Sequence, residues 1–581
     1  MSDDNVLLSQ IFLDSLIQVG LEAVCISPGS RSTPLTIATW QRRQEIEVYS
    51  ILDERSAAFL ALGIAKVSKK PVALICTSGS ALVNYMPAVV EASQTGVPLI
   101  ILSADRPHRL RKSGANQTID QIKIFGGYCK EFFEMPPPTI LNQKEAMHIR
   151  SSATRGYAEA MTGGVVHFNF PFDKPLENRE PLKSLKQIQN IFPAKVPSIY
   201  QITQTIKNEV LEELVSNFRE ERGVIIFGPT AYDPELITAG NLLSRFLAYP
   251  ILADPLSNIR TFSQLGENVV SGAESLFRSQ KIQDILLPKV IIQVGASVTS
   301  KYLLEFISRS HSAFKIQIGH NWADEFHSTD IFLPGDPKYI LNDLLQFLDQ
   351  PLRKGKDYLA KYHRLEEFHR NKVSTFLERE KLSSSFIISA IQSLPNLSNV
   401  FAANSLTIRN IDQFLLPLEK DIRIYGNRGV SGIDGNISTA SGISLFTKSR
   451  MDVLFIGDLA FLHDLNALLS VQKYKVNLKI VVLNNSGGGI FRRLPISKYK
   501  EIFDEYFLTP QKVSIKSLVE GFGVRYRTFD RRKNIQKLIA EEVLDSSPVV
   551  IEIKTDSEIE HSILSHFWEN YIADLERLKL K

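Results

Sequence analysis

The sequence predicts an α/β protein built from three domains of parallel-sheet type. Short apolar strands alternate with helical patterns along all 581 residues, which is typical of parallel sheets covered by helices on both faces. The pattern falls into three successive blocks of similar size, without a residue-level repeat. A chain of this length has room for about three to six domains. We expect domains at 1–185, 195–350 and 382–581, with a helical linker at 351–381.

Buried strands are predicted in each block from short runs of Val, Ile and Leu bounded by turn-forming residues. The first block gives AVCIS, VALICTS, PLIILSA and GVVHFNFP, with helices such as SAAFLALGIAKVS between them. The second block gives GVIIFG, PILADP, KVIIQVG and KIQIG. The third gives NVFAANS, DIRIYGN, DVLFIGD, LKIVVLNN and PVVIEIK.

Composition argues against several functional classes. The chain has 67 Lys and Arg against 63 Asp and Glu, a formal net charge of +4. It has no long basic run, so we do not expect nucleic acid as a partner. Its three cysteines are an odd number without metal-ligand spacing, which favours a reduced intracellular compartment. The acidic N-terminus lacks a signal-peptide pattern, and no apolar run reaches membrane-spanning length. We therefore expect a cytoplasmic protein without a membrane span.

Polar residues follow two apolar runs in the third block. Gly457 and Asp458 follow VLFI, and Asn484, Asn485 and Gly487 follow IVVL. Two neighbouring parallel strands would bring both ends to one edge of a sheet, where open α/β sheets bind ligands. A carboxylate, an amide oxygen and a backbone carbonyl are ligands that suit octahedral Mg²⁺, and a diphosphate would complete its coordination. The alternative is that both dipeptides are βα turns.

The spacing of these residues indicates a cofactor. Asn485 stands 27 residues after Asp458, which fits a strand end, a crossover helix over about 463–472 and the next strand. The pattern resembles the signature of thiamine diphosphate enzymes, which runs from Gly-Asp to Asn-Asn across about this distance. The usual third glycine of that signature is Leu459 here.

A second group of residues, in the first block, predicts an anion site. Ser30 and Arg31 stand in the turn of ISPGSRSTPLT, where backbone N–H groups and a guanidinium can bind a carboxylate. Glu54 precedes an apolar helix. A Glu beside apolar surface has the shifted proton affinity that proton exchange with a ring nitrogen requires. The alternative for Glu54 is an N-terminal helix acid favoured by the helix dipole.

Together the two groups resemble a thiamine diphosphate enzyme with an N-terminal pyrimidine-binding domain, a central domain and a C-terminal diphosphate-binding domain. Six segments narrow the resemblance: SPGSRSTPLT, DERSAAFLALG, SADRPHRLRKSGANQTIDQ, YGNRGVSGIDG, GDLAFLHDLNAL and NNSGGGIF. They look like the 2-succinyl-5-enolpyruvyl-6-hydroxy-3-cyclohexene-1-carboxylate synthases of menaquinone and phylloquinone biosynthesis, over nearly the whole chain. Members of that family share the Leu found here at Leu459.

This resemblance implies decarboxylation of 2-oxoglutarate and 1,4-addition of the resulting succinyl carbanion to isochorismate. Thiamine diphosphate would be the electron sink, with Mg²⁺ or Mn²⁺ as the metal. Glu54 would bond N1′ of the aminopyrimidine, and Asp458, Asn485 and the Gly487 carbonyl would hold the metal. Further cofactor contacts implied by the resemblance are Ile433, Gly457, Leu459, Ile490 and Phe491. For the apolar ones among them, ordinary core packing is the alternative.

Both substrates are dianions, so the resemblance also implies a cationic site. The residues at matching motif positions are Ser30, Arg31, Arg106, Gln117, Lys301, Ser405, Arg409 and Arg428. Arginine suits this role because its planar fork binds carboxylates bidentately. For each cation alone, a solvated surface charge or a structural ion pair is the alternative. Some relatives carry Arg directly after the Lys of the middle-domain motif, where this chain has Tyr302, so one carboxylate contact is expected to be absent or made by the phenol.

Glu54 and Asp458 fall in different predicted domains, which in this superfamily meet across a two-fold interface. The resemblance therefore implies a homodimer or a dimer of dimers with sites at the subunit interface. Two alternatives to the synthase stay open. Another thiamine-dependent 2-oxoacid carboligase or decarboxylase, such as an acetohydroxyacid synthase-like enzyme, would turn over pyruvate with little need for the arginines. A non-enzymatic relative would bind the cofactor without turnover.

Overall fold

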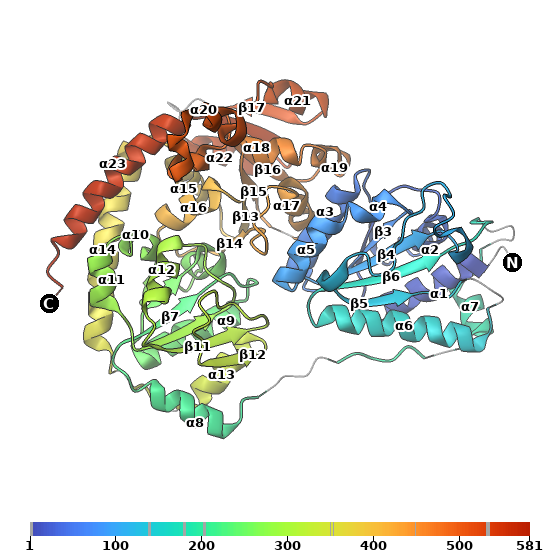
Figure 1. Cartoon of the computed structure of the whole chain (residues 1–581), viewed down its shortest axis with the longest axis horizontal. Coiled ribbons are helices and arrows are strands. Elements are labelled where there is room, and N and C mark those ends of the chain that lie inside the picture. The colour runs from blue at the N-terminus through green and yellow to red at the C-terminus, as the bar shows by residue number, and fades with distance from the viewer. Residues whose placement is uncertain are drawn as a thin grey trace. The chain divides into compact units, whose positions relative to one another are not determined.

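Three parallel six-stranded sheets make up the protein (Figure 1), which confirms the predicted fold class. The structure is a computed structural model, and it describes residues 4–137, 141–177, 182–193, 195–200, 205–348, 350–352, 354–447, 449–529 and 535–580. By their contacts the residues form two compact units. Unit 1 is Met1–Gln201, Asn427–Lys448 and His463–Val476; unit 2 is Ile202–Gly426, Ser449–Leu462 and Asn477–Lys581. The domain boundaries given above stay predictions.

Unit 1 is built around a sheet with the strand order β2-β1-β3-β4-β6-β5. Its strands are β1 (Ala23–Ile26), β2 (Glu47–Ser50), β3 (Val72–Cys76), β4 (Leu99–Asp105), β5 (Cys129–Glu134) and β6 (Val165–Pro171). Its helices are α1 (Asp4–Gln18), α2 (Thr33–Gln41), α3 (Glu54–Ser68), α4 (Ser80–Val83), α5 (Met86–Thr95), α6 (Gln143–Met161), α7 (Leu185–Ile191), α17 (Asn436–Phe446) and α19 (Ala467–Lys473).

Helices cover both faces of this sheet, because successive strand residues point to opposite sides. Ile75 and Leu102 pack in the core that includes α1 and α6. Their neighbours Leu74 and Ile101 pack in the core that includes α3 and α5. These strands are therefore buried on both faces, which explains their nearly continuous apolar runs.

Helix α17 comes from the third block of the sequence, yet it belongs to unit 1 because it packs against α3. A Cβ atom on Gly63 would lie 2.1 Å from the carbonyl oxygen of Thr439, and one on Gly442 would lie 2.1 Å from that of Leu60. Only glycine at these two positions lets the helices approach so closely.

Unit 2 contains two sheets, with the orders β12-β11-β10-β7-β8-β9 and β14-β13-β15-β16-β18-β17. The first has β7 (Gly223–Phe227), β8 (Ile251–Ala253), β9 (Val269–Val270), β10 (Val290–Val294), β11 (Phe314–Gly319) and β12 (Ile331–Pro334). The second has β13 (Ser398–Ala402), β14 (Ile422–Tyr425), β15 (Asp452–Gly457), β16 (Leu478–Asn484), β17 (Arg525–Thr528) and β18 (Val549–Lys554). One hydrophobic core joins residues of both sheets, such as Ile226 and Phe455.

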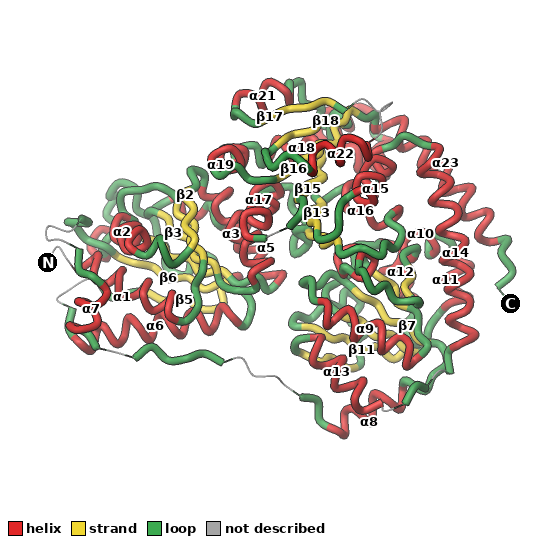
Figure 2. Tube along the Cα trace, turned by 180° about the vertical axis from the view of Figure 1, so that it is seen from behind, coloured by secondary structure: helices red, strands yellow, loops and turns green. Residues whose placement is uncertain are grey.

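The helices of unit 2 include two long ones that lie side by side in both views (Figures 1 and 2). They are α14 (Lys356–Arg379) and α23 (Ser557–Glu576). His369 Nδ1 lies 3.0 Å from the Tyr571 hydroxyl, and Lys372 Nζ donates to Asp574 over 2.6 Å. Within the described ranges, no helix is long and apolar enough to cross a membrane.

The other helices of unit 2 cover the two sheets. They are α8 (Asn208–Asn217), α9 (Pro234–Leu247), α10 (Ala273–Leu276), α11 (Gln280–Leu286), α12 (Lys301–Arg309), α13 (Pro337–Leu348), α15 (Ser383–Ser393), α16 (Leu406–Phe414), α18 (Asp458–His463), α20 (Lys500–Phe503), α21 (Ile515–Gly521) and α22 (Ile535–Val543).

The predicted crossover helix over about 463–472 is wrong in one respect. The chain forms α18 and α19 instead, with a break at 464–466. The buried carboxylate of Asp464 lies in that break, where it accepts hydrogen bonds from the backbone N–H (2.8 Å) and hydroxyl (3.1 Å) of Ser438. These hydrogen bonds tie the Asp464 side chain to the first turn of α17. They therefore compete with continuation of the helix through Asp464 itself.

Candidate cofactor and substrate site

The two strand ends singled out in the third block lie next to each other. β15 and β16 are parallel neighbours, and Gly457 pairs with Leu483 in their register. Asp458, directly after β15, and Asn485, directly after β16, therefore meet at one edge of the sheet. Leu459 follows Asp458 in α18 and is half-buried.

This edge contains a set of oxygen atoms suited to a divalent cation. The Asp458 carboxylate is 5% exposed and accepts the N–H of Gly487 over 2.7 Å. The side-chain oxygen of Asn485 is buried and has no hydrogen-bond partner in the described part of the chain. The Gly487 carbonyl accepts one N–H, from Gly489 at 2.9 Å, which leaves its second lone pair for another ligand. The donor set therefore fits Mg²⁺ or Mn²⁺.

Gly487 is required by the geometry of this loop. Its φ is +132°, and an added Cβ atom would lie 2.1 Å from the carbonyl oxygen of Leu508. Burial raises the pKa of Asp458 to about 6, an effect that the N–H groups of Gly487 and Leu459 oppose. A bound cation would further favour the ionised carboxylate.

Glu54 begins α3, in unit 1. Asp53 is the N-cap of this helix and accepts the N–H of Ser56 over 3.1 Å, so a different residue from Glu54 satisfies the helix terminus. Glu54 lines a cavity of about 370 Å³ together with Leu52, Asp53, Arg55, Asn84, Asn466 and Leu469. Its carboxylate makes no hydrogen bond or ion pair with the residues that the structure describes. The carboxylate is thus available to a ligand.

Two of the expected cations come close together in unit 1. Arg31 is 5% exposed, and its Nη1 donates to the carbonyl of Phe172 over 3.0 Å. Burial lowers the pKa of Arg31, and the charge of Arg106 lowers it further. The Nε atom of Arg106 is buried without a partner among the described residues. An anion would satisfy both guanidiniums. Ser30 is exposed in the same turn.

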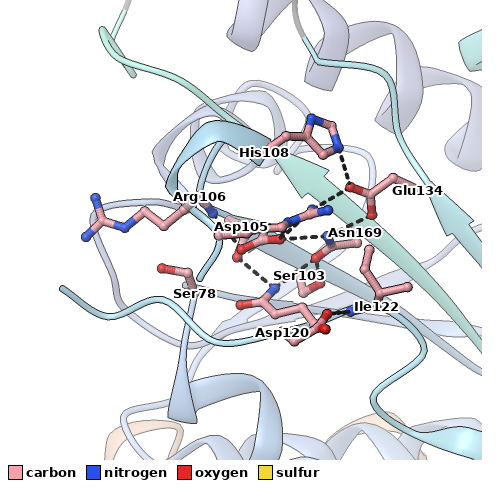
Figure 3. Close-up of polar contacts among 12 residues, drawn as sticks. Ser78, Ser103, Asp105, Arg106, His108, Asp120, Ile122, Glu134 and Asn169 are labelled. Carbon is pink, nitrogen blue, oxygen red and sulfur yellow. Dashed lines mark hydrogen bonds and ion pairs between the residues drawn. The ribbon is translucent and has the colours of Figure 1, made fainter. Parts of the chain in front are cut away.

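A buried polar network supports Arg106 from behind (Figure 3). Asp105 accepts from the Arg106 N–H (2.7 Å), from Arg111 (2.8 Å) and from Asn169 (2.9 Å). Arg111 and Asn169 also donate to Glu134, over 2.5 and 2.9 Å. In Figure 3 the Asn169 side chain lies between those of Asp105 and Glu134, whereas the side chain of Arg106 extends away from them. The network therefore fixes the backbone of Arg106 and leaves its guanidinium open.

Gln121 joins this network to the loop that carries Gln117. Its Nε2 donates to Asn169 over 2.8 Å, and its Oε1 accepts the N–H of Gly79 over 3.0 Å. Gln117 has a φ of +54°, and two hydrogen bonds of 3.0 Å with Ser78 hold it in that conformation. The amide nitrogen of Gln117 thus already has a protein partner.

The remaining candidates in unit 1 lie in the segment before α17. Arg428 is half-buried, and the next two backbone N–H groups, of Gly429 and Val430, donate to the Glu91 carboxylate over 3.0 and 2.8 Å. Ile433 is 39% exposed, with its carbonyl bonded to Asn436 over 2.7 Å. An isoleucine this exposed is not an ordinary core residue.

The unit 2 candidates differ in their surroundings. Arg409 is half-buried, and its Nη1 donates over 2.7 Å to the carbonyl of Ser405, which has a φ of +72°. Burial lowers the pKa of Arg409. The Lys301 side chain is 76% exposed and pairs with Glu305 one turn along the same helix at 3.4 Å. The geometry therefore does not direct Lys301 toward Arg409.

Ile490 and Phe491 follow Gly487 and Gly488 in the short 3₁₀ helix η5 (Gly489–Arg493) and are half-buried. Phe491 packs edge-on against Phe507, with ring centroids 5.6 Å apart. Sequence reasoning missed two further residues near the candidates. Gln121 stands inside the quoted segment GANQTIDQ, and Arg493 stands two residues after NNSGGGIF ends.

Three family models match the chain in order. The N-terminal TPP binding domain of thiamine pyrophosphate enzymes matches residues 7–124. The middle domain of thiamine pyrophosphate enzymes matches residues 183–401, and the C-terminal TPP binding domain matches residues 411–553.

Relatives of known name match along almost the whole chain. The 2-succinyl-5-enolpyruvyl-6-hydroxy-3-cyclohexene-1-carboxylate synthase of Roseiflexus sp. (strain RS-1) is 36% identical over 574 residues, 96% of each chain. The synthase of the same name from Bacillus cytotoxicus is 36% identical over 581 residues, 97% of this chain and 96% of the relative. Benzoylformate decarboxylase from Polynucleobacter necessarius superposes with a TM-score of 0.71 at 17% identity, over 95% of this chain and 98% of that one. This last likeness shows the fold alone.

Proposed function

Because the chain belongs to the family of 2-succinyl-5-enolpyruvyl-6-hydroxy-3-cyclohexene-1-carboxylate synthases, we propose that it decarboxylates 2-oxoglutarate and adds the succinyl group to isochorismate in a 1,4 sense. The reaction would serve menaquinone or phylloquinone biosynthesis. The identity of 36% over 96% of both chains carries this proposal. The guanidinium groups at the candidate site support it, since two dicarboxylate substrates need cationic partners.

For the cofactor, Asp458, Asn485 and the Gly487 carbonyl would hold Mg²⁺ or Mn²⁺ against the diphosphate. The buried, unpartnered oxygen of Asn485 supports this assignment. Thiamine diphosphate, when bound, supplies the electron sink for the loss of CO₂. Glu54 would hold a proton at N1′ of the aminopyrimidine. Further contacts to the cofactor would come from Ile433, Gly457, Leu459, Ile490 and Phe491.

For the substrates, the arginines would neutralise carboxylates. Arg31 and Arg106 would act together in unit 1, where the unpartnered Nε of Arg106 supports an anion site. Gln117 and Ser30 would orient substrate in the same unit, with Arg428. Arg409, Ser405 and Lys301 would contribute from unit 2. Lys301 would have to leave Glu305 to do so.

Product analysis tests this proposal. Purified protein is mixed with thiamine diphosphate, Mg²⁺ and 2-oxoglutarate, with and without isochorismate, and the products are identified by mass. We expect an adduct that forms only when isochorismate is present. Turnover of pyruvate without such an adduct would favour an acetohydroxyacid synthase-like carboligase, and no turnover at all would favour a non-enzymatic relative.

We further propose a cytoplasmic homodimer, or a dimer of such dimers, in which Glu54 and Asp458 of one working site come from different subunits. Co-expression of differently tagged Glu54→Gln and Asp458→Ala chains tests this. Each heterodimer would keep one intact site, so the random mixture should have about a quarter of the wild-type activity. Activity no higher than that of the two variants alone would place both residues of a working site in one chain.

A further inference from the structure

The loop before α17 carries two of the residues that we propose for the site. Arg428 and Ile433 lie within residues 427–435, between the end of β14 and the start of α17, in neither a helix nor a strand. We call these residues the 427–435 loop. A loop lacks the regular backbone hydrogen bonds of a helix or a sheet, so other groups must hold its backbone if its side chains are to keep their places.

Glu91 of α5 holds the middle of this loop. Its Oε1 atom accepts the backbone N–H of Gly429 over 3.0 Å, and its Oε2 atom accepts that of Val430 over 2.8 Å. The Glu91 side chain is only 1% exposed. Hydrogen bonds to an ionised acceptor are stronger than those between neutral groups. Two such bonds therefore fix the two residues that directly follow Arg428.

Helix α3 is joined to the same carboxylate. It lies beside α5 (Figures 1 and 2), and near its end Lys66 places Nζ 3.7 Å from Glu91 Oε1. Two N–H groups and one ammonium thus offset the burial of the Glu91 charge. Because α3 begins with Glu54, Glu91 links the helix of Glu54 to the loop of Arg428.

The loop also fits closely against α5 beside Glu91. A Cβ atom on Gly429 would lie 2.8 Å from Cγ2 of Thr95 and 3.0 Å from the carbonyl oxygen of Glu91. Thr95 is fixed in turn, because its hydroxyl donates to that carbonyl over 2.7 Å. A larger residue than glycine at position 429 would push the loop away from the carboxylate.

Other groups hold the two ends of the loop. Asn427 donates to the hydroxyl of Thr439 over 2.9 Å, and Asn436 donates to the carbonyl of Ile433 over 2.7 Å. Both of these partners belong to α17. The backbone near Ile433 is therefore held without Glu91, which acts on the part of the loop next to Arg428.

We propose that Glu91 is a positioning residue, which holds the backbone next to Arg428 so that the guanidinium meets a substrate carboxylate. The Glu91 carboxylate is buried and already engaged by two N–H groups and Lys66, so it acts through Arg428 and not by contact with substrate. The inference rests on the proposed function, in which Arg428 neutralises a substrate carboxylate, and adds the residue that fixes its place.

The test replaces Glu91 with glutamine, which keeps one acceptor oxygen but turns a donor toward the second N–H group. KM is measured for each substrate with the other saturating, along with the concentration of thiamine diphosphate that gives half-maximal activity. We expect Glu91→Gln to raise KM about 10- to 100-fold for one substrate, as loss of a hydrogen bond to a charged group does. The cofactor requirement should change less, because Ile433 keeps its bond to Asn436. Unchanged KM values, or a change confined to the cofactor requirement, would overturn the inference.

Lys66→Met is the matched control for lost stability. It removes the cation beside the Glu91 carboxylate but leaves both acceptors of the loop N–H groups. The Tm should fall in this variant, as it does in Glu91→Gln, while both KM values stay near wild type. An equal rise of KM in Lys66→Met would show that the effect follows from lost stability and would exclude a positioning role.

A double-mutant cycle shows whether Glu91 acts through Arg428. Arg428→Met and Glu91→Gln are measured singly and together. If Glu91 only places the guanidinium, its loss adds little once the guanidinium is gone, and the double variant should match the KM of Arg428→Met within about twofold. Effects that multiply, as those of independent sites do, would contradict the inference.

A second disruption of the loop leaves Glu91 intact and applies even where Glu91→Gln fails to fold. Gly429→Ala places a methyl group against Cγ2 of Thr95 and should raise the same KM. Thr95→Ser removes that Cγ2 and keeps the hydroxyl, so adding it to Gly429→Ala should restore part of the KM. A normal KM in Gly429→Ala, or no recovery in the pair, would count against the positioning role.

Calorimetry keeps this inference separate from the proposed function. If the wild-type protein forms no isochorismate-dependent product, the proposed function fails. Succinate, a simple dicarboxylate, is then titrated into the wild-type protein, Arg428→Met, Glu91→Gln and the double variant, each with thiamine diphosphate and Mg²⁺. Weaker binding to Glu91→Gln, with the double variant no weaker than Arg428→Met, supports the positioning role. Unchanged binding to Glu91→Gln, a further loss in the double variant, or no binding to the wild type overturns it.

Discussion

The loop after β4 in unit 1, which carries Arg106, and the loop after β16 in unit 2, which carries Asn485 and Gly487, both follow a central strand. They are held in different ways. After β4, two side chains of the sheet, Asp105 and Asn169, and Gln121 of the loop itself are hydrogen-bonded to one another or to the loop backbone. After β16, backbone contacts and Asp458 hold the loop, and the oxygen of Asn485 stays buried without a partner among the described residues. The first loop is held by protein groups alone, whereas the second leaves a buried oxygen for the cation that we propose it binds.

The largest expected effect comes from removing the Glu54 carboxylate. It tests whether unit 1 takes part in the reaction in addition to holding a rigid loop. Glu54→Gln should lower carboligation about 10²- to 10⁴-fold, because the amide cannot exchange a proton with N1′. Fold and diphosphate binding should persist, since Asp53 caps α3. Steady-state rates measure carboligation, and cofactor titration measures diphosphate binding. A near-normal rate would mean that Glu54 serves only as an acidic first-turn residue.

The next effect tests whether the loop after β16 depends on a ligand for its stability. Thiamine diphosphate and Mg²⁺ at about 100 times their Kd should stabilise the wild-type protein by about 2.7 kcal/mol. Asp458→Asn should lose this gain, because the amide does not attract the cation as the carboxylate does. Thermal unfolding with and without ligands measures the gain. An undiminished shift in Asp458→Asn would move the metal site elsewhere.

A smaller effect is expected from the matched substitution in unit 1. Asp105→Asn should destabilise the ligand-free protein by about 2 kcal/mol, because the buried carboxylate loses charge-assisted bonds from Arg111 and Asn169. The stabilisation that thiamine diphosphate and Mg²⁺ give in thermal unfolding should persist in this variant. The contrast between the two loops would be reversed if Asp105→Asn instead abolished the stabilisation by thiamine diphosphate and Mg²⁺ and left the stability of the ligand-free protein unchanged.

The smallest effect concerns pH. His167 is buried beside the unit 1 network, 2.7 Å from the Ser103 hydroxyl, and burial lowers its pKa to about 3. The unfolded chain, with a histidine pKa of about 6.5, therefore binds the proton first, and stability falls as pH decreases below about 6.5. The loss from His167 should be about 1 kcal/mol between about pH 6.5 and about pH 5.5.

His369 in unit 2 is the comparison for this pH effect, since burial lowers its pKa to about 4. Hydrogen exchange at the two pH values separates the units. His167→Gln should remove the pH dependence of the protection factors, which are corrected for intrinsic exchange, in β4 and β6, and leave that of α14 unchanged. Equal pH dependence of β4 and β6 in the variant and the wild type would exclude His167 as the cause.

The cofactor half of the site could be located from the sequence because its signal is local. Asp458 and Asn485 each follow an apolar run directly, and adjacent strands bring their ends together. The networks behind the site have no such signal. Gln121 and Asn169 are 48 residues apart, and Arg278 and Trp568, whose ring centroid lies 4.0 Å from the guanidinium, are farther apart still in the sequence.

The sequence by itself determined the interior strands, the parallel architecture and the strand ends that carry Asp458 and Asn485, since buried strands leave apolar runs that turn residues interrupt. Only the tertiary structure decided the strands the patterns missed, β2, β5, β9, β12 and β17. All five lie at sheet edges, where one neighbour and shorter or more polar sequences weaken the signal. It also decided the partners of Asp105 and Arg278, because burial of a charge and the number of its counter-ions are set by segments far apart in the chain.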